Sequence, residues 1–272
     1  MIMRIRSTLL RIFSLSFFLL SFSGQLAAQT NRPFSLSLKT DGLLLGGGII
    51  LSGTDLILDN VMEINRKKYT GRLYDKDDVN SFDRKFMRSY SKNRDKSADF
   101  LLAATMAAPA LLALTDKEEW LTCAVMYAET LLIANGIKEL TKLGVSRSRP
   151  YMYYDISTVP KKDLRDGDWA NSFPSGHSAM AFAGATFTSY TFCKYFPESK
   201  LRLPVMLGSY SMAAGVAALR ISSGNHFMSD VLTGAVIGSL TGFLVPWAHT
   251  FNTTHDLNLS ILENGIFVTI KL

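Results

Sequence analysis

The stretch PSGHSAMAFAGATFTSYTFC, Pro174–Cys193, decides the fold class of this chain. Pro174, Ser175 and Gly176 form a helix-start signal, and the residues from Ser178 to Cys193 are small or apolar without the alternation of a strand. Four other segments share this pattern: Phe100–Leu114, Trp120–Lys142, Leu203–Leu219 and Val231–Ala248. The sequence therefore predicts an all-α protein built as a helical bundle.

The composition favours a bundle that lies in a membrane. Hydrophobic residues make up 47% of the chain and mean hydropathy is +0.14, which is high for a soluble protein and modest for a polytopic one. Several expected helices are slightly shorter than the ~20 residues that usually span a bilayer. Glu129 lies inside one of them and must face the bundle or water rather than lipid. A soluble bundle stays open as the alternative.

The first residues read as an export signal. Arg4, Arg6 and Arg11 precede an apolar run from Ile12 to Phe22, and the small residues Ala27 and Ala28 follow. We expect a signal peptide over residues 1–29, with a retained membrane anchor as the alternative.

The remainder of the chain divides by composition into three parts. Residues 30–97 contain an apolar, glycine-rich stretch, Gly42–Leu58, and then a polar segment, Asn60–Ser97, with 11 Lys and Arg against 6 Asp and Glu. Residues 98–250 hold the expected helices and form the predicted catalytic core. Residues 251–272 are a tail whose weak alternation at Ile266, Val268 and Ile270 predicts a short strand.

Charge and cysteine content narrow the range of partners. The net charge of +6 suits an anionic lipid surface or a phosphorylated substrate, and no basic and aromatic nucleic-acid motif accompanies it. Cys123 and Cys193 sit in apolar stretches and read as packing thiols, because a zinc site needs more ligands nearby. We expect no metal, no cofactor and no nucleic acid; the sequence does not indicate an oligomeric state.

Three short stretches carry basic or imidazole side chains suited to phosphate. They are Lys142-x6-Arg149-Pro150, Pro174-Ser175-Gly176-His177 and Arg220-x5-His226-x3-Asp230. Each lies where an expected helix begins or ends. If the helices alternate up and down, all three stretches emerge at one end of the bundle, so we expect a single site there.

The second stretch resembles an anion-binding helix start. The backbone N–H groups of a first helical turn attract anions, and Gly176 lets the backbone approach a bound group. His177 would stand beside that anion, where an imidazolium could protonate a departing oxygen. Taken alone, the stretch is better explained as an ordinary helix cap with a surface histidine.

The third stretch pairs an imidazole with a carboxylate. His226 and Asp230 share a helix face at i, i+4, so the carboxylate could accept a proton from one ring nitrogen and leave the other free to attack. Arg220 can fork two hydrogen bonds onto phosphate. Lys142 and Arg149 add positive charge, although basic clusters are also common beside membrane helices.

Together the three stretches resemble the type 2 phosphatidic acid phosphatase superfamily, which includes bacterial acid phosphatases and vanadium haloperoxidases. Its signature KxxxxxxRP, PSGH and SRxxxxxHxxxD corresponds here to KLGVSRSRP, PSGH and LRISSGNHFMSD. Leu219 stands where the signature has Ser, which removes one possible hydroxyl near the phosphate. The resemblance covers about Lys142 to Asp230.

The resemblance implies a role for each motif residue. His226 would be the nucleophile that forms a phosphohistidine, Asp230 would orient it, and His177 would be the general acid. The phosphate-binding groups would be Lys142, Arg149, Ser175, Gly176 and Arg220. The implied activity is metal-independent hydrolysis of a phosphomonoester or pyrophosphate, most simply a lipid-linked one.

Several nearby residues carry weaker expectations. We expect Asp166, Asp168 and Trp169 in a solvated loop, with the mouth of the site as the alternative. We expect Arg147 as an exposed basic residue, with a further phosphate contact as the alternative. His249 and His255 match no motif and are expected to be interfacial or surface groups.

The location and the exact activity have alternatives. Relatives in bacterial membranes usually act on the outer face of the inner membrane, so we expect a periplasmic site, although the basic segment before residue 98 would favour the cytoplasm if Gly42–Leu58 spans. Other readings are a soluble periplasmic acid phosphatase, a lipid phosphotransferase, a haloperoxidase, and a non-enzymatic anion-binding or transport protein.

Overall fold

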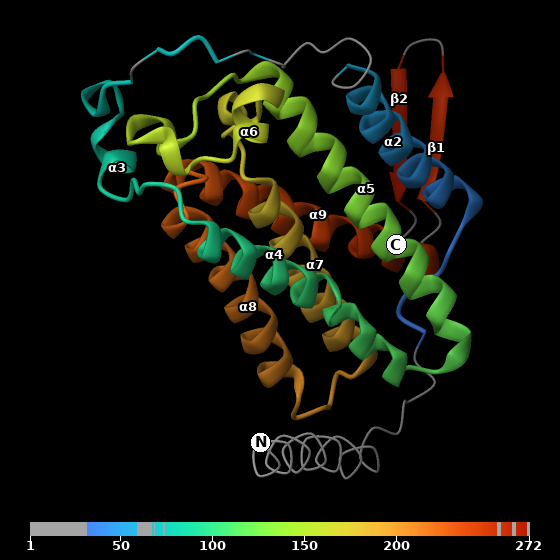
Figure 1. Cartoon of the computed structure of the whole chain (residues 1–272). Coiled ribbons are helices and arrows are strands. Elements are labelled where there is room, and N and C mark those ends of the chain that lie inside the picture. Colours follow the sequence, from blue (N-terminus) through green and yellow to red (C-terminus); the bar gives the residue numbers. More distant parts are fainter. Residues whose placement is uncertain are drawn as a thin grey trace, which may run out of the picture.

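The structure is a computed structural model that describes residues 32–58, 67, 69–72 and 74–254, together with the backbone of two strands in the tail. The expected signal peptide at residues 1–29 lies outside the described residues, as does His255. Within the described part the chain is a helical bundle (Figure 1), as the sequence predicts. Its α-helices are α2 Leu38–Leu56, α3 Ser81–Arg84, α4 Lys92–Met106, α5 Trp120–Gly144, α6 Lys161–Asp166, α7 Gly176–Tyr195, α8 Arg202–Ser222 and α9 Met228–Thr254.

Helix α7 is the centre of the bundle. It packs against α9, α8, α5 and α4, and most of its residues are buried although they are small or polar. Three of its hydroxyls, on Thr188, Ser189 and Thr191, donate to backbone carbonyls one turn earlier, as Thr188 does to Gly184 at 2.7 Å. Because these hydroxyls have partners inside their own helix, α7 can be buried on all sides.

A row of glycines brings α9 into backbone contact with α7. Gly234, Gly238 and Gly242 recur every four residues, on one face of α9. A Cβ atom at Gly238 would lie 2.0 Å from the carbonyl oxygen of Ala179, which no side chain tolerates. This close approach fixes the start of α9 beside the start of α7, where two of the three sequence motifs lie.

Helix α2 packs along α5 in the same manner. A Cβ at Gly136 of α5 would lie 2.4 Å from the Cβ of Leu51, and Ser52 donates a hydrogen bond to the carbonyl of Leu132 at 2.9 Å. The sequence left open whether Gly42–Leu58 spans a membrane or packs in the bundle. The structure shows the described part of this stretch as a helix packed against the bundle.

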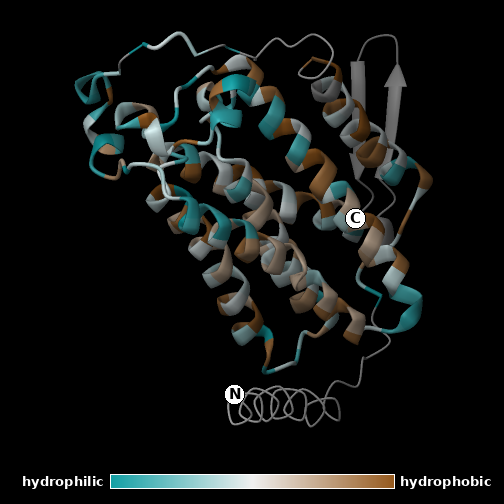
Figure 2. Cartoon of the chain, viewed as in Figure 1, coloured by the Kyte–Doolittle hydropathy of each residue, from teal (hydrophilic) through white to brown (hydrophobic). Residues whose placement is uncertain are grey.

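Several helices have the length and the apolar outer surface of membrane spans. Four segments qualify: Lys92–Leu114, Lys117–Gly144, Arg202–Ser222 and Met228–Thr250. On α9 the large apolar residues Leu232, Val236 and Leu240 follow one another at helical spacing and are all more than half exposed. Figure 2 shows that hydrophobic residues recur along these helices. An apolar outer surface of this kind suits lipid contact.

The connection between α5 and α7 is a packed cap and not a solvated loop. Short 3-10 turns at Pro150–Tyr153 and Asp168–Ala170 fold it over the end of the bundle. Tyr151 and Trp169 are buried there in an apolar cluster. The expectation of a solvated loop is therefore wrong for Trp169; Asp166, by contrast, is partly exposed and pairs with Arg165 at 3.2 Å.

The tail contains two short strands where the sequence predicted one. Strands β1 Leu257–Leu262 and β2 Gly265–Ile270 pair antiparallel (Figure 1).

Candidate active site

The three sequence motifs meet in one cavity of about 470 Å³ at the end of the bundle where α5 stops and α7 and α9 begin. Both histidine rings of the motifs border this cavity. Among its lining residues are six of the eight motif residues expected at the site: Lys142, Arg149, Gly176, His177, Arg220 and His226. Groups that are up to 84 residues apart in sequence thus face a single space, as the alternating helix directions imply.

Ser175 and Asp230 lie behind the cavity wall. Both are fully buried, and the Ser175 N–H donates to the backbone carbonyl of Asp230 at 3.0 Å. The Ser175 hydroxyl caps α7 by accepting from the Ser178 N–H at 3.4 Å. Ser175 therefore joins α7 to α9, and the first-turn N–H groups of Gly176 and His177 are the ones that a phosphate can approach.

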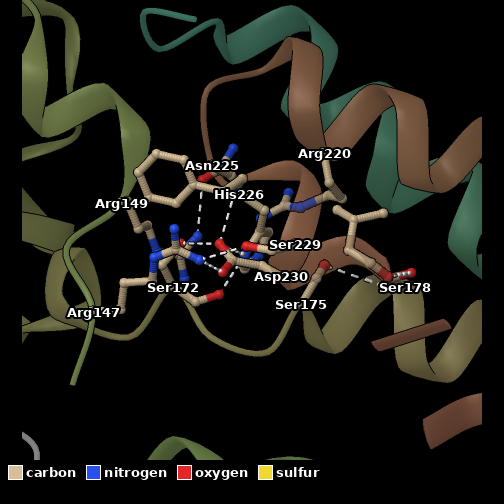
Figure 3. A network of polar contacts seen from close by, with 12 residues as sticks. Arg147, Arg149, Ser172, Ser175, Ser178, Arg220, Asn225, His226, Ser229 and Asp230 are labelled. Atoms are coloured by element: carbon tan, nitrogen blue, oxygen red, sulfur yellow. Dashed lines mark hydrogen bonds and ion pairs between the residues drawn. The ribbon is translucent and has the colours of Figure 1, made fainter. Parts of the chain in front are cut away.

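The ring of His226 is held by a backbone carbonyl (Figure 3). Its Nδ1 atom donates to the carbonyl oxygen of Ser172 at 2.7 Å. A carbonyl can only accept, so Nδ1 carries the proton and the lone pair is on Nε2. Burial, together with the charges of Arg149, Arg220 and Lys142, holds the pKa of His226 well below its ordinary value. The ring is therefore neutral at pH 7 and has the protonation state of a nucleophile.

Asp230 does not make the direct hydrogen bond to His226 that its spacing predicted. Its Oδ2 atom is 3.8 Å from Nδ1 of His226, too far for a hydrogen bond. The carboxylate instead accepts from the Ser172 hydroxyl at 2.5 Å and from the N–H of Phe227 at 2.8 Å. It thereby fixes the two backbone segments that flank the His226 ring, and acts on the ring through them.

Arg147 is not the exposed residue that the sequence suggested. Its guanidinium donates to Asp230 at 2.5 Å, to Asp83 at 2.7 Å and to Ser229 at 2.8 Å, and it lies over the Phe227 ring at 4.0 Å. Its side chain is 24% exposed because these partners surround it. Arg147 neutralises the buried Asp230 and belongs to the support of the site.

Asp83 was not singled out in the sequence and completes this support. It is buried, and it accepts from the N–H of Ser229 at 2.9 Å and from the Ser229 hydroxyl at 2.7 Å. Burial alone would raise the pKa of Asp83, but its hydrogen bonds, first among them that from Arg147, lower the pKa below the ordinary value. Asp83 therefore stays ionised and ties the segment before α4 to the start of α9.

Arg220 lines the cavity, and one of its hydrogen-bond donors is unpaired among the described residues. Its Nη1 atom pairs with Asp95, whose carboxylate also accepts from Asn225 at 2.9 Å. The Nε atom of Arg220 is buried and has no hydrogen-bond partner among the residues that the structure describes. An unpaired buried donor is costly, so a ligand oxygen at this atom would be strongly favoured.

Arg149 is also placed by a carboxylate and an amide. Its guanidinium donates to the Asp168 carboxylate at 2.7 Å and to Asn225 at 3.0 Å. Burial would lower the pKa of Arg149, but the Asp168 charge outweighs it and raises the pKa above the ordinary value. Asp168 lines the cavity and positions a cation, which is the alternative prediction for this residue, and its side chain remains 46% exposed.

His177 contacts a carboxylate on the facing helix. Its Nε2 atom is 2.7 Å from Oδ1 of Asp99 in α4. Burial, and then the charge of Arg220, lower the pKa of His177 to about 4 although Asp99 opposes the shift. His177 is thus neutral at pH 7 until a negative charge arrives beside it.

Two lysines one helical turn apart border the cavity. Lys142 lies 3.3 Å from a carboxylate oxygen of Glu139, which also pairs with Lys138. Lys138 is buried, and its side-chain carbons lie against the start of α7 at Gly176. Lys138 was not predicted as a site residue, although its i, i+4 spacing to Lys142 places both on one helix face.

The remaining sequence predictions concern Leu219, Glu129 and His249. Leu219, at the position where the motif has Ser, is half-buried and is not among the cavity-lining residues. Glu129 faces the bundle interior as predicted, but it does so against His249 at 2.7 Å, and both are fully buried. The expectation of an interfacial or surface His249 is therefore wrong.

Site residues could be predicted from the sequence only where they belong to a motif or follow the periodicity of a helix. Three aspartates contact site residues that are more than 60 positions away in the sequence: Asp83, Asp95 and Asp99. No local sequence pattern indicates such contacts. Ser172 acts through its backbone carbonyl, which every residue possesses. Of the residues that the structure adds to the site, Lys138 alone had a sequence pattern that could have indicated it, namely its i, i+4 spacing to Lys142.

Comparison with known proteins identifies relatives of the helical core. Residues 124–254 match the model of the PAP2 superfamily. A PA-phosphatase related-family protein of Dictyostelium discoideum is 33% identical over 134 residues, covering 47% of this chain and 48% of its own. The lipid A 1-phosphatase of Porphyromonas gingivalis is 39% identical over 132 residues, covering 48% of this chain and 25% of its own. The chain thus spans about half and about a quarter of the lengths of these relatives.

Among solved structures, a transmembrane PAP2-type phosphatidylglycerolphosphate phosphatase from Bacillus subtilis aligns with a TM-score of 0.43 and 19% identity. The alignment covers 76% of this chain and 94% of the other.

Proposed function

We propose that the chain is a member of the PAP2 superfamily, whose model matches residues 124–254, and that it is a phosphatase that hydrolyses a lipid-linked phosphomonoester or pyrophosphate. The reaction proceeds through a phosphohistidine on His226 and draws its charge stabilisation from side chains. We further assign the catalytic core to residues 98–250, with residues 30–97 and the tail 251–272 as accessory parts.

One observation carries this proposal. A neutral imidazole and a second histidine border the same cavity as Lys142, Arg149 and Arg220, and Arg220 has a buried Nε donor without a partner among the described residues. Phosphoryl transfer depends mainly on positioning and on stabilising charge at the equatorial oxygens. The cavity offers both.

In the first step, Nε2 of His226 attacks phosphorus, the N–P bond forms and the bond to the leaving oxygen breaks. His226 keeps its Nδ1 proton, which the Ser172 carbonyl accepts at 2.7 Å, so the positive phosphoimidazolium is stabilised. The leaving oxygen takes a proton from His177. A bound phosphate dianion raises the pKa of His177 from its low resting value and so supplies the protonated form.

In the second step, water attacks phosphorus from the side that the leaving group vacated. The neutral His177 takes a proton from this water, the N–P bond breaks, and inorganic phosphate and free His226 result. An alcohol in place of water would give a phosphotransferase.

The apolar surroundings support a lipid-linked substrate. Phe100, which follows the cavity residue Asp99 in α4, and Leu232, in the first two turns of α9, are both more than half exposed near the cavity end. The two relatives are described as a PA-phosphatase related-family protein and a lipid A 1-phosphatase, which supports the same class. We place the protein in a bacterial inner membrane with the cavity facing the periplasm.

A phosphate-release panel tests the proposal. Membranes with the wild type should release phosphate from at least one of phosphatidic acid, phosphatidylglycerol phosphate, a polyprenyl pyrophosphate and lipid A, and brief EDTA treatment should not change the initial rate. His226→Gln should lower the rate by roughly 10³-fold or more with the protein still folded. Full activity of this variant would exclude the mechanism, and saturable phosphate binding without turnover would favour an anion-binding protein.

Thiol labelling tests the location. Lys76 lies in an exposed 3-10 turn before α4, so Lys76→Cys should react with an impermeant maleimide in cells whose outer membrane alone is permeabilised. Protection until the inner membrane is opened would place this segment in the cytoplasm.

A further inference from the structure

We propose that a divalent transition-metal ion, with zinc the best fit, binds among Asp41, Glu129 and His249. These residues come from α2, α5 and α9, and their ligand atoms lie within 4.8 Å of one another. The ion is distinct from the phosphate chemistry and holds three helices together.

The cluster lies well away from the phosphate cavity. Glu129 precedes Lys142 by 13 residues on the same helix, which corresponds to about 20 Å along its axis. His249 lies close to the far end of α9 from Asp230. None of the three residues lines the cavity.

Two carboxylate oxygens in the cluster lack a donor. Glu129 is fully buried; its Oε2 atom lies 2.7 Å from Nε2 of His249, but its Oε1 atom has no hydrogen-bond partner among the described residues. Oδ1 of Asp41 is buried and also lacks a partner in the part of the chain that the structure describes, and it lies 3.8 Å from Nδ1 of His249. Unpaired carboxylate oxygens inside a bundle are expensive, so the arrangement points to a bound positive charge.

The net charge of the three side chains also favours a bound cation. Of the described residues, His249 is the one side chain able to carry positive charge that contacts either carboxylate. With both carboxylates ionised and the imidazole neutral, as ligands of a metal, the three groups carry a formal charge of −2, which a divalent ion cancels. Buried charges that are not cancelled are strongly destabilising.

The donor types favour a transition metal. Imidazole suits zinc and its neighbours, whereas Ca²⁺ and Mg²⁺ prefer all-oxygen sites with more ligands. At tetrahedral zinc with bonds of about 2.0–2.2 Å, ligand atoms lie roughly 3.4 Å apart, so no pair here must close by more than about 1.5 Å. The Ser35 carbonyl lies 3.3 Å from the His249 ring and, with water, is a candidate for the fourth position.

Such an ion would connect α2 to the catalytic core. The segment before α2 is already attached to the end of α9, since the Ser35 N–H donates to the His249 carbonyl at 3.2 Å. A metal bridging Asp41, Glu129 and His249 would add a bond from α2 to each of two core helices. Structural zinc contributes its binding free energy to folding in this way.

Metal analysis of the purified full chain tests the proposal. The protein is expressed with a tag that contains no histidine, purified in detergent from zinc-supplemented cells, and measured by mass spectrometry for metals. The wild type should carry roughly one zinc per chain. Glu129→Gln and His249→Gln should lower that content by roughly tenfold or more.

Two controls locate the ion. Glu119→Gln changes another buried carboxylate, bonded to Tyr195 at 3.0 Å, and should keep the metal. His226→Gln changes a cavity imidazole and should keep it too; loss of the metal in this variant would move the ion to the phosphate cavity and overturn the proposal.

A spectroscopic measurement on the wild type covers the case in which the cluster variants do not fold. Chelated wild-type protein titrated with Co²⁺ should develop the visible absorption of a tetrahedral site, and Zn²⁺ should abolish it. Addition of Zn²⁺ should also raise the unfolding temperature. A chain that is purified without metal and shows neither Co²⁺ absorption nor a stability change would show that the cluster is only a hydrogen-bonded network.

Discussion

The Nδ1 atom of His226 is 2.7 Å from the carbonyl oxygen of Ser172 and 3.8 Å from the carboxylate of Asp230. The proton of the His226 ring is therefore held by the main chain, and Asp230 holds that main chain through the Ser172 hydroxyl at 2.5 Å. Two residues that sequence spacing would couple directly are coupled through a third.

Ser172→Ala tests this indirect coupling. Removing the hydroxyl leaves the carbonyl present but less firmly placed, and a hydrogen bond to a charged group contributes about 1.5–3 kcal/mol. We expect kcat to fall by roughly tenfold with KM little changed, measured on the best substrate of the panel.

The matched control is Ser178→Ala. Ser178 is equally buried and donates to the Val231 carbonyl at 2.8 Å, but it does not contact the His226 ring or Asp230. It should lower stability and leave kcat nearly unchanged. Equal kcat values for wild type and Ser172→Ala would contradict the coupling.

Asp99→Asn should shift the alkaline limb of the pH profile. Asp99 raises the pKa of His177 against the larger lowering effect of burial, so its removal lowers that pKa further. The general acid then loses its proton at lower pH, and the alkaline limb of kcat moves to lower pH. Because Asp99 is 61% exposed and screened, we expect a shift of about 0.2–0.7 pH units that shrinks at high salt.

The acid limb provides a second pH measurement. Nε2 of His226 must be unprotonated to attack, and its pKa is held well below 6.5. The acid limb of kcat/KM for wild-type enzyme should therefore lie clearly below pH 6.5. A limb at or above 6.5 that tracks His226 would show that burial and the surrounding cations do not control this ring.

Lys138→Gln should weaken anion binding. Lys138 lines the cavity one turn before Lys142, and its charge contributes to holding the phosphate oxygens. We expect the inhibition constant of inorganic phosphate or vanadate to rise by roughly 3- to 10-fold. Lys194→Gln, an exposed lysine near the other end of α7, should leave it unchanged; equal constants for Lys138→Gln and wild type would remove Lys138 from the site.

Gly238→Ala should destabilise the bundle. The added Cβ would lie 2.0 Å from the carbonyl of Ala179, and overpacking of this kind costs about 1–3 kcal/mol. Gly208→Ala is the control, because nothing lies within 4 Å of a Cβ at that exposed helix position. The unfolding temperature in detergent should fall for Gly238→Ala and stay level or rise for Gly208→Ala.

Much of the architecture could be predicted from the sequence because the patterns that indicate a helix lie within the helix itself and at its ends. The apolar runs and their start signals placed both ends of α5, α7 and α8 and the start of α9 within about three residues, the usual uncertainty of such boundaries, whereas α9 continues six residues beyond the predicted end at Ala248. Helix α4 begins at Lys92, eight residues before the apolar run at Phe100, because its first turns are polar and face the cavity end. An apolar pattern cannot mark such turns.

The support of the site could not be predicted. Arg147 and His249 are buried by carboxylates that are 64 to 120 residues away, and only the folded chain brings such partners together. The motif spacing correctly indicated that Asp230 lies near His226. It could not reveal that Arg147, Ser172 and Phe227 occupy the carboxylate oxygens.

The measurement that tests the central claim most directly is capture of the phosphoenzyme. Enzyme mixed with substrate labelled in the scissile phosphate is quenched within milliseconds in alkali, which preserves phosphohistidine, and the labelled peptide is sequenced. The account predicts label on His226 at a level that rises and decays with turnover, with none in His226→Gln. Steady phosphate release by the wild type with no label on His226 at any time point would contradict it.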